Sequence, residues 1–255
     1  MRVRTVGIFF LFPLLVNINT FAKNKKSTVE GFIATIERVK RSVIPVVCGK
    51  FDQAGQFQSQ IFEGTAFFVD TQGHFVTPAH VIRDLGLITP QQPVPCVRAI
   101  FVPEDGWQRE ATVINWRWMV IGNCDTDESL DLAVCSTVDK NDSSVPVSLV
   151  DIRPPDGTDV AMSGFPLGVS QPLTTRCNIA AYANVVAPDG TRELWLDKGN
   201  WPGASGSPIY LEDGSVIGIL LARGTQDSVG ITMARPSHFI LSFLQSKGVV
   251  IQKQE

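Results

Sequence analysis

Short apolar or alternating runs, separated by turn residues, recur along almost the whole chain and constrain its fold more than any other feature. Such runs are typical of β-strands, because successive side chains point to opposite faces and Gly, Pro, Asp and Asn interrupt the runs at turns. Each half of the chain holds about six of them. The predicted strands are residues 43–51, 64–69, 74–78, 97–101, 111–116 and 131–136, and then 159–164, 176–185, 194–197, 207–211, 215–222 and 230–234.

This pattern predicts an all-β protein made of two six-stranded antiparallel β-barrels, at about residues 43–140 and 155–235. A helix is expected before the first barrel, where Ser27 and Glu30 form a capping box ahead of apolar residues at helical spacing. A second helix is expected to be capped by Ser237 and to stop at Lys247-Gly248. A binding or catalytic site is expected in the cleft between the two barrels.

Composition excludes two classes of protein. With 44% apolar and 18% charged residues, the chain buries enough surface to fold, so it is not a disordered protein. The formal net charge is −3 and no basic stripe is present, so nucleic acid is not an expected partner.

The first 22 residues resemble a secretory signal peptide. Arg2 and Arg4 precede an apolar stretch, and Thr20-Phe21-Ala22 is a cleavage-site pattern. We therefore expect a secreted or periplasmic protein whose mature domain covers residues 23–255. An uncleaved membrane anchor is the alternative, although the apolar run is shorter than the roughly 20 residues of a membrane span. No later stretch is long enough to span a membrane.

The five cysteines are an odd number for an exported protein, so at least one is expected to be free or paired with another chain. Cys48 and Cys135 lie in apolar runs typical of small buried residues. Cys96 and Cys124 lie in more polar surroundings and are the expected disulfide partners, with Cys177 unassigned. The cysteine and histidine spacings do not fit a structural metal site, and no cofactor is expected.

Three segments carry groups that nucleophilic catalysis needs. Ser205 lies between glycines in Gly203-Ala204-Ser205-Gly206, so a tight turn can expose its hydroxyl and aim the backbone N–H groups of Gly203 and Ser205 at an attacked carbonyl. His80 ends one predicted strand segment and Asp131 begins another. A serine hydroxyl becomes a good nucleophile when an imidazole accepts its proton and a buried carboxylate orients that imidazole.

Other residues compete for these roles. His74 falls in a predicted turn and His238 in the first turn of the last helix, where surface or capping roles are usual. Asp125 and Asp127 lie in a predicted polar loop, whereas Asp131 opens an apolar strand. The rival nucleophile is Ser207, which is followed by a proline.

The order His, Asp, Ser resembles that of the trypsin-like, chymotrypsin-fold serine proteases. The runs Gly64–Val69 and Gly73–His80 are similar to the approach to the catalytic histidine in the HtrA/DegP-type bacterial protease domain. The segments Val216–Ile219 and Gly230–Ser237 resemble the strands beside the specificity pocket of that group, and the resemblance covers about residues 28–246. We expect the protease domain without the PDZ domains that many members carry.

The resemblance implies a serine endopeptidase that forms an acyl-enzyme. Ser205 would be the nucleophile, His80 the general base, Asp131 the orienting carboxylate, and Gly203 and Ser205 the oxyanion-hole donors. Two departures from the family pattern, Ala204 before the nucleophile and Pro78 before the Ala-His pair, put the rate in question more than the type of reaction.

Substrate specificity is inferred from the same resemblance. Gly199, Leu221 and Gly230 are the expected pocket residues, and they predict protein or peptide substrates with an apolar P1 residue of small to medium size. Leu221 could instead be a core residue. The alternative function is an inactive, secreted binding protein on the protease scaffold, although an intact His80, Asp131 and Ser205 set favours the enzyme.

Overall fold

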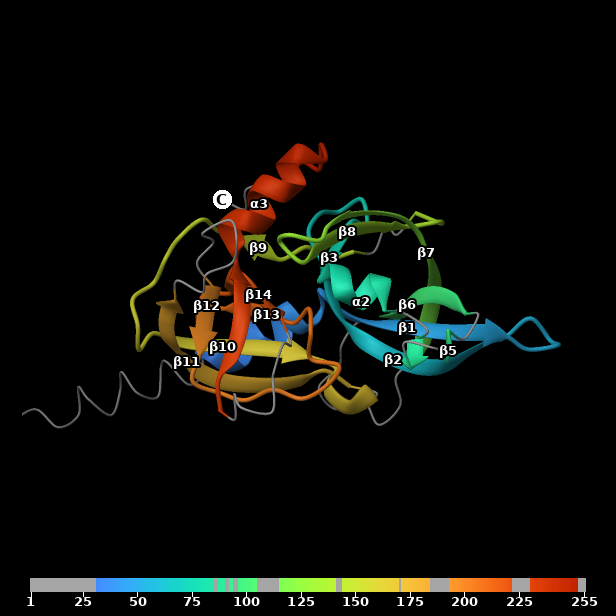
Figure 1. Cartoon of the computed structure of the whole chain (residues 1–255), viewed down its shortest axis with the longest axis horizontal. Coiled ribbons are helices and arrows are strands. Elements are labelled where there is room, and N and C mark those ends of the chain that lie inside the picture. Colours follow the sequence, from blue (N-terminus) through green and yellow to red (C-terminus); the bar gives the residue numbers. More distant parts are fainter. Residues whose placement is uncertain are drawn as a thin grey trace, which may run out of the picture.

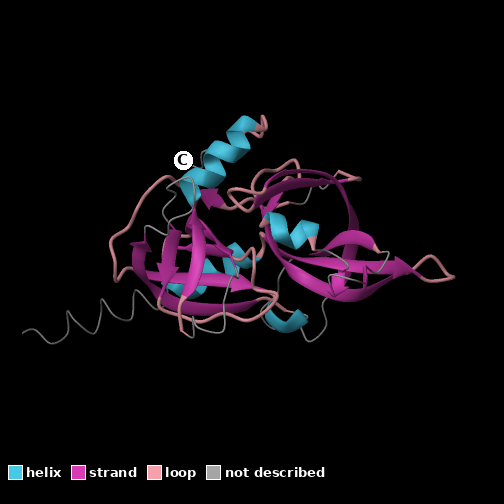
Figure 2. Cartoon of the chain, in the orientation of Figure 1, coloured by secondary structure: helices cyan, strands magenta, loops and turns pink. Residues whose placement is uncertain are grey.

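The computed structural model describes residues 31–84, 87–89, 92–93, 96–104, 115–140, 144–169, 171–183, 193–221 and 230–251. In this part of the chain, two β-barrels lie side by side and a few short helices lie outside them (Figures 1 and 2). The predicted all-β fold with two six-stranded barrels is confirmed.

The first barrel is closed and antiparallel. Its strands, in order around the barrel, are β1 (Val43–Phe51), β2 (Phe57–Phe68), β3 (Phe75–Thr77), β8 (Leu132–Thr137), β7 (Trp116–Asp127) and β6 (Val97–Pro103). A separate two-stranded sheet is formed by β4 (Leu87–Thr89) and β5 (Gln92–Pro93).

The second barrel also closes on itself, through pairing of its first and last strands. In barrel order these are β13 (Pro208–Tyr210), β10 (Asp159–Gly164), β11 (Leu173–Ala183), β12 (Glu193–Leu196), β15 (Thr232–Pro236) and β14 (Ser215–Leu221). The short strand β9 (Ser148–Leu149), from the segment between the barrels, pairs parallel with β14.

The helices lie at the barrel ends and between the barrels. Residues 31–40 are helical and continue the predicted first helix, whose capping box lies outside the described residues. The others are α2 (Ala79–Arg83), the 3-10 turn η1 (Pro166–Gly168) and α3 (Ser237–Ser246). The last helix contacts β14 and β15 of the second barrel and β8 of the first (Figure 1).

The predicted end of α3 is confirmed and its predicted cap is wrong. Lys247 is the C-cap residue, and Gly248 after it has a φ of 73°, as expected of a glycine that ends a helix. At the start, no side chain caps the helix. The Ser237 hydroxyl donates instead to the Val150 carbonyl at 2.5 Å, which ties α3 to the segment between the barrels.

Alternation along the strands divides the buried side chains between separate cores. In β1, Ile44, Val46 and Cys48 point into the first barrel, whereas Val43 belongs to a different cluster outside it. Strand β8 shows the same period of two, because Ala133 and Cys135 face the barrel interior while Leu132 does not. The second barrel has its own core, which includes residues of β10, β12 and β14.

The remaining cluster joins the two barrels. It contains the outward-facing residues of β1, β2 and β8, together with residues of β10, β13 and β14. Phe32 and Val39 of the first helix and Ile240 and Phe243 of α3 complete it. The barrels are therefore packed against each other through an apolar interface, which fixes the position of one relative to the other.

The main correction to the strand assignment concerns β7. The sequence analysis placed Asp125 and Asp127 in a polar loop, but both belong to β7, which extends through Asp127. Most of its polar side chains are exposed although it pairs antiparallel with β8, so the segment lacks the apolar alternation of a half-buried strand. The first part of the predicted strand at 111–116 lies outside the described residues.

The expected disulfide between Cys96 and Cys124 is wrong, although Cys48 and Cys135 are buried, as their apolar surroundings predicted. The disulfides are Cys48–Cys96 and Cys124–Cys135, and Cys177 is free and buried. Strand register explains both bonds. Cys124 lies directly opposite Cys135, while Cys96 comes two residues before Arg98, the residue opposite Cys48.

Among the described residues, no helix is long and apolar enough to cross a membrane. The predicted signal peptide at residues 1–22 lies outside the described residues.

Candidate active site

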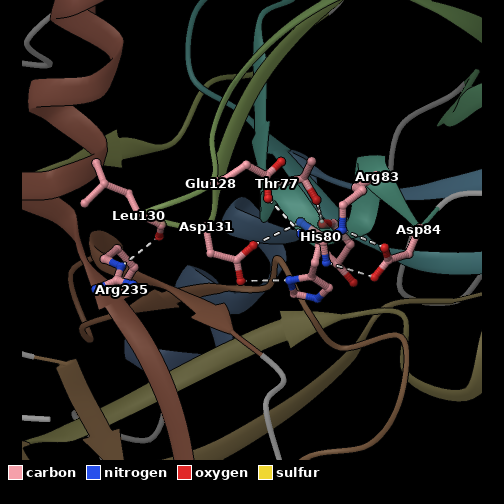
Figure 3. Close-up of polar contacts among 9 residues, drawn as sticks. Thr77, His80, Arg83, Asp84, Glu128, Leu130, Asp131 and Arg235 are labelled. Atoms are coloured by element: carbon pink, nitrogen blue, oxygen red, sulfur yellow. Dashed lines mark hydrogen bonds and ion pairs between the residues drawn. The ribbon is translucent and has the colours of Figure 1, made fainter. Parts of the chain in front are cut away.

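His80 and Asp131 lie together on the first barrel, although 51 positions separate them in sequence (Figure 3). His80 is the second residue of α2, and Asp131 lies immediately before β8. The Asp131 carboxylate accepts one hydrogen bond from the His80 backbone N–H at 2.9 Å, and its other oxygen lies 2.8 Å from His80 Nδ1. With the proton on Nδ1, the lone pair of the neutral ring is on Nε2.

The backbone and a neighbouring arginine define the position of Asp131. Asp131 has a φ of 54°, in the left-handed region that aspartate tolerates better than most residues, and it is only 2% exposed. The carbonyl of the preceding Leu130 accepts a hydrogen bond at 2.9 Å from Nε of Arg235, a buried residue of β15 (Figure 3). A residue of the second barrel thus holds the turn that carries Asp131.

Ser205 lies in a tight turn of the second barrel between Trp201 and β13. Two glycines give this turn its shape, with φ values of 89° at Gly203 and 92° at Gly206. Side chains do not fit there, because an added Cβ would lie 2.6 Å from the Phe165 carbonyl oxygen at Gly203 and 1.7 Å from the Thr65 carbonyl oxygen at Gly206. The glycines around Ser205 are therefore required by close backbone approach as well as by backbone conformation.

The hydrogen bonds of this turn leave two backbone donors unused. The N–H groups of Ala204, Gly206 and Ser207 donate to carbonyls of Trp201, Leu220 and Ala204, respectively. Within the described part of the chain, the N–H groups of Gly203 and Ser205 form no hydrogen bond. They are thus available to stabilise a developing oxyanion.

One cavity of about 350 Å³ brings the histidine and serine segments together, while Asp131 contacts His80 and is not among the lining residues. It is lined by His80 and Val81 from α2 and by Gly203 and Ser205 from the serine turn. The other lining residues are Glu63, Asp84, Asn200 and Pro202. Among the described residues no hydrogen bond joins Ser205 to His80, a contact that in apo enzymes often tightens only when substrate binds.

The competing residues are engaged elsewhere. His74 lies beside the carboxylate of Asp70 within its own turn. Ser207 donates its hydroxyl to the Ala204 carbonyl at 2.7 Å, which stabilises the serine turn. Asp127 accepts hydrogen bonds from Ser129, which hold the pKa of its carboxyl below its usual value.

Two of the three predicted pocket residues lie side by side. A Cβ added at Gly199 would be 3.5 Å from the backbone nitrogen of Gly230. Gly199 also lines a small cavity of about 70 Å³, together with Trp201 and with Ala204 of the serine turn. Leu221 is buried at the end of β14, opposite Met233, and does not line this cavity.

The sequence analysis did not identify three residues that support the site: Thr65, Thr77 and Arg235. Each acts through contacts with residues far away in sequence, and no local motif marks such contacts. No group of His, Cys, Asp and Glu residues within the described ranges has the arrangement of a metal site.

Comparison with protein-family models matches residues 64–219 to a trypsin-like peptidase domain. The chain is 27% identical over 222 residues to mouse serine protease HTRA4 and 26% identical over 221 residues to its human counterpart. These alignments cover 83% of this chain but 40% of each relative, so the chain spans about two fifths of their length.

Among solved structures, a serine endoprotease from Yersinia pestis matches with a TM-score of 0.59 and 19% sequence identity. The match covers 86% of this chain and 66% of that one. At this level of identity the similarity is one of fold.

Proposed function

Because the chain belongs to the trypsin-like peptidase family, we propose that it is a serine endopeptidase whose catalytic residues are Ser205, His80 and Asp131. The observation that carries this proposal is the pairing of a buried aspartate with His80, which lines the same cavity as Ser205. A ring oriented through Nδ1 presents Nε2 as the general base that a serine nucleophile requires.

In the first half of the reaction, Ser205 Oγ attacks the carbonyl carbon of the scissile peptide bond and its proton moves to His80 Nε2. Asp131 stabilises the resulting imidazolium and keeps the ring oriented. The carbonyl oxygen becomes an oxyanion, which the N–H groups of Gly203 and Ser205 stabilise. When the C–N bond breaks, His80 gives the proton to the leaving amine and an acyl-enzyme remains.

In the second half, a water molecule attacks the ester carbonyl of the acyl-enzyme. His80 Nε2 takes a proton from this water as the bond forms, and the same N–H groups stabilise the second oxyanion. Breakage of the C–O bond to Ser205 then returns the proton to Oγ and releases the carboxylic acid product. The reaction needs no group beyond the chain's own residues and water.

We propose protein or peptide substrates with an apolar P1 residue of small to medium size. The adjacent, exposed Gly199 and Gly230 support this preference, because neither brings a charge or a bulky side chain to the pocket side of Ser205. The mildly acidic composition favours neither nucleic acid nor an anionic surface as a partner.

Export is part of the same proposal, with residues 1–22 as a cleaved signal peptide and residues 23–255 as the mature protease domain. The two disulfides support an oxidising compartment, outside the cell or in a periplasm.

A fluorophosphonate probe, which reacts covalently with an activated serine, tests the function. The full chain should be labelled, and Ser205→Ala should abolish labelling, since loss of the serine of a triad costs on the order of 10⁶ in kcat. Ser207→Ala is the control two residues away. It removes the hydrogen bond to the Ala204 carbonyl and leaves the nucleophile in place, so it should still be labelled, at a reduced rate. Cleavage of a peptide library by the unlabelled wild-type chain then reads out the P1 preference.

Two results would contradict the proposal. A chain that is folded by circular dichroism and never reacts with the probe would favour the inactive binding protein. Labelling that survives in Ser205→Ala and disappears in Ser207→Ala would show that the nucleophile is Ser207 and not Ser205.

A further inference from the structure

We propose that Thr65 is a positioning residue that holds the serine turn in the conformation that stabilises the oxyanion. This inference rests on the proposed function. Thr65 lies in β2 of the first barrel, is fully buried, and contacts the turn of the second barrel that carries Ser205. Its backbone N–H donates to the Ser205 carbonyl at 2.7 Å, and its hydroxyl donates to the Gly203 carbonyl at 2.9 Å. One residue therefore binds the carbonyls of both residues whose N–H groups would stabilise the oxyanion.

The hydroxyl of Thr65 also accepts a hydrogen bond at 2.9 Å from the backbone N–H of Phe165. Phe165 follows β10 directly, and its carbonyl oxygen lies against Gly203. The Thr65 side chain thus links three backbone segments: its own strand, the end of β10, and the serine turn. Because the group is buried, no water replaces either hydrogen bond when the hydroxyl is removed.

Thr77 extends this connection to the histidine. Its hydroxyl donates to the Thr65 carbonyl at 2.8 Å, and Thr77 lies three residues before His80, at the end of β3. It also lies opposite Ala133, two residues after Asp131 in the chain. The hydrogen bonds of Thr65 therefore run from the strand that leads to His80 to the turn that contains Ser205.

The turn depends on this anchoring because of its glycines. Gly203 lacks the side chain that restricts backbone rotation, so contacts on its carbonyl set the orientation of the adjoining peptide groups. A peptide group that rotates away from the oxyanion costs the reaction much of the stabilisation that one donor provides, typically 10² to 10³ in kcat when a donor is removed entirely. We expect a smaller effect from loosening the turn, about 10- to 100-fold.

The test compares three variants of the full chain. Thr65→Val keeps the shape of the side chain and removes the hydroxyl, and Thr65→Ser keeps the hydroxyl. Thr35→Val is the matched control, because the buried Thr35 hydroxyl also donates to a backbone carbonyl, that of Glu212, in a part of the molecule that does not line the catalytic cavity.

Two measurements are made on each variant. The first is the rate of labelling by a fluorophosphonate, together with kcat and KM for p-nitrophenyl acetate. Thr65→Val should reduce the labelling rate and kcat by about 10- to 100-fold with little change in KM, while Thr65→Ser and Thr35→Val stay within about threefold of the wild type. The second is amide hydrogen exchange of the peptide covering residues 203–207, which should be faster in Thr65→Val alone.

The outcomes separate this inference from the proposed function. If the wild type is labelled and Thr65→Val is labelled equally fast, Thr65 does not position the turn. Equal losses of kcat in Thr65→Val and Thr35→Val, with similar decreases in melting temperature, would show a general stability effect. That result would also overturn the inference. If the wild type is not labelled at all, the proposed function fails, and unchanged exchange at 203–207 in Thr65→Val would overturn the anchoring role as well.

Discussion

Asp131 receives two hydrogen bonds from His80, one from the backbone N–H and one from Nδ1 of the ring. Because the two bonds reach different carboxylate oxygens, the aspartate fixes both the first turn of α2 and the orientation of the imidazole that this turn carries. Asp131 is only 2% exposed, so water does not compete for either bond. The geometry of the pair is thus set within the first barrel, by contacts that involve neither substrate nor Ser205.

Substitution of Asp131 by Asn should preserve the fold and remove most of the activity. The amide has the same shape, but it no longer stabilises the imidazolium or selects the tautomer with a proton on Nδ1. We expect kcat to fall by about 10⁴. Stopped-flow hydrolysis of p-nitrophenyl acetate measures the loss, and Asp125→Asn, at an exposed position of β7, is the control. A loss of less than tenfold would argue against a catalytic role for Asp131.

Gly206→Ala should destabilise the protein strongly. Its φ is 92°, and an added Cβ would lie 1.7 Å from the carbonyl oxygen of Thr65, so backbone must move. Gly55→Ala is the matched control, since Gly55 also has a positive φ, of 77°, but an added Cβ would meet no atom within 4 Å. We expect about 1 kcal/mol for the control, from conformation alone, and several times more for Gly206→Ala. Urea denaturation gives both values, and equal losses would contradict the geometry of the turn.

Arg235→Leu should slow the reaction although Arg235 does not line the catalytic cavity. The substitution leaves the Leu130 carbonyl without the donor that Nε supplies at 2.9 Å, next to the residue with the unusual φ. Loss of this partly buried hydrogen bond costs about 1 kcal/mol, so the turn that carries Asp131 should rearrange. We expect a loss of about tenfold or more in fluorophosphonate labelling. The exposed Arg153→Leu should label normally, and normal labelling of a stably folded Arg235→Leu would contradict this role.

Cys177 should be unreactive in the folded protein. Burial, assisted by the negative charge of Asp197, raises the pKa of its thiol to about 12. Ellman's reagent at pH 8 should therefore detect no thiol in the native chain and one per chain in guanidinium without reductant. Because the unfolded thiol ionises near pH 8.5, the unfolded state loses a proton that the folded state keeps, so stability should fall as the pH rises from about 9 to 12. Rapid reaction of the native protein would contradict the buried position.

This pH dependence has a direct control. Cys177→Ala removes the thiol, so its stability should fall less steeply over the same pH range than that of the wild type. Identical slopes would assign the effect to other groups.

Much of the architecture could be predicted from local patterns. Strand β10 occupies the predicted residues 159–164, and β1 occupies 43–51, because both are apolar runs bounded by turn residues. Strand β7 was missed in large part, since it exposes polar side chains along much of its length and lacks the alternation that identifies a strand. The disulfides were mispaired for a related reason: polarity around a cysteine says little about which strand lies opposite it.

The sequence by itself determined the local chemistry: a histidine at the end of an apolar strand segment, an aspartate before a buried strand, and a serine between glycines that only a tight turn accommodates. That His80 lies in the short helix α2 was shown by the structure. The tertiary structure decided which distant groups support them. Thr65 reaches the serine turn across 138 positions and Arg235 reaches the Asp131 turn across 105, and both contacts cross between the barrels. Strand spacing and turn residues act over a few positions, whereas these contacts depend on how two closed barrels pack, which no local pattern encodes.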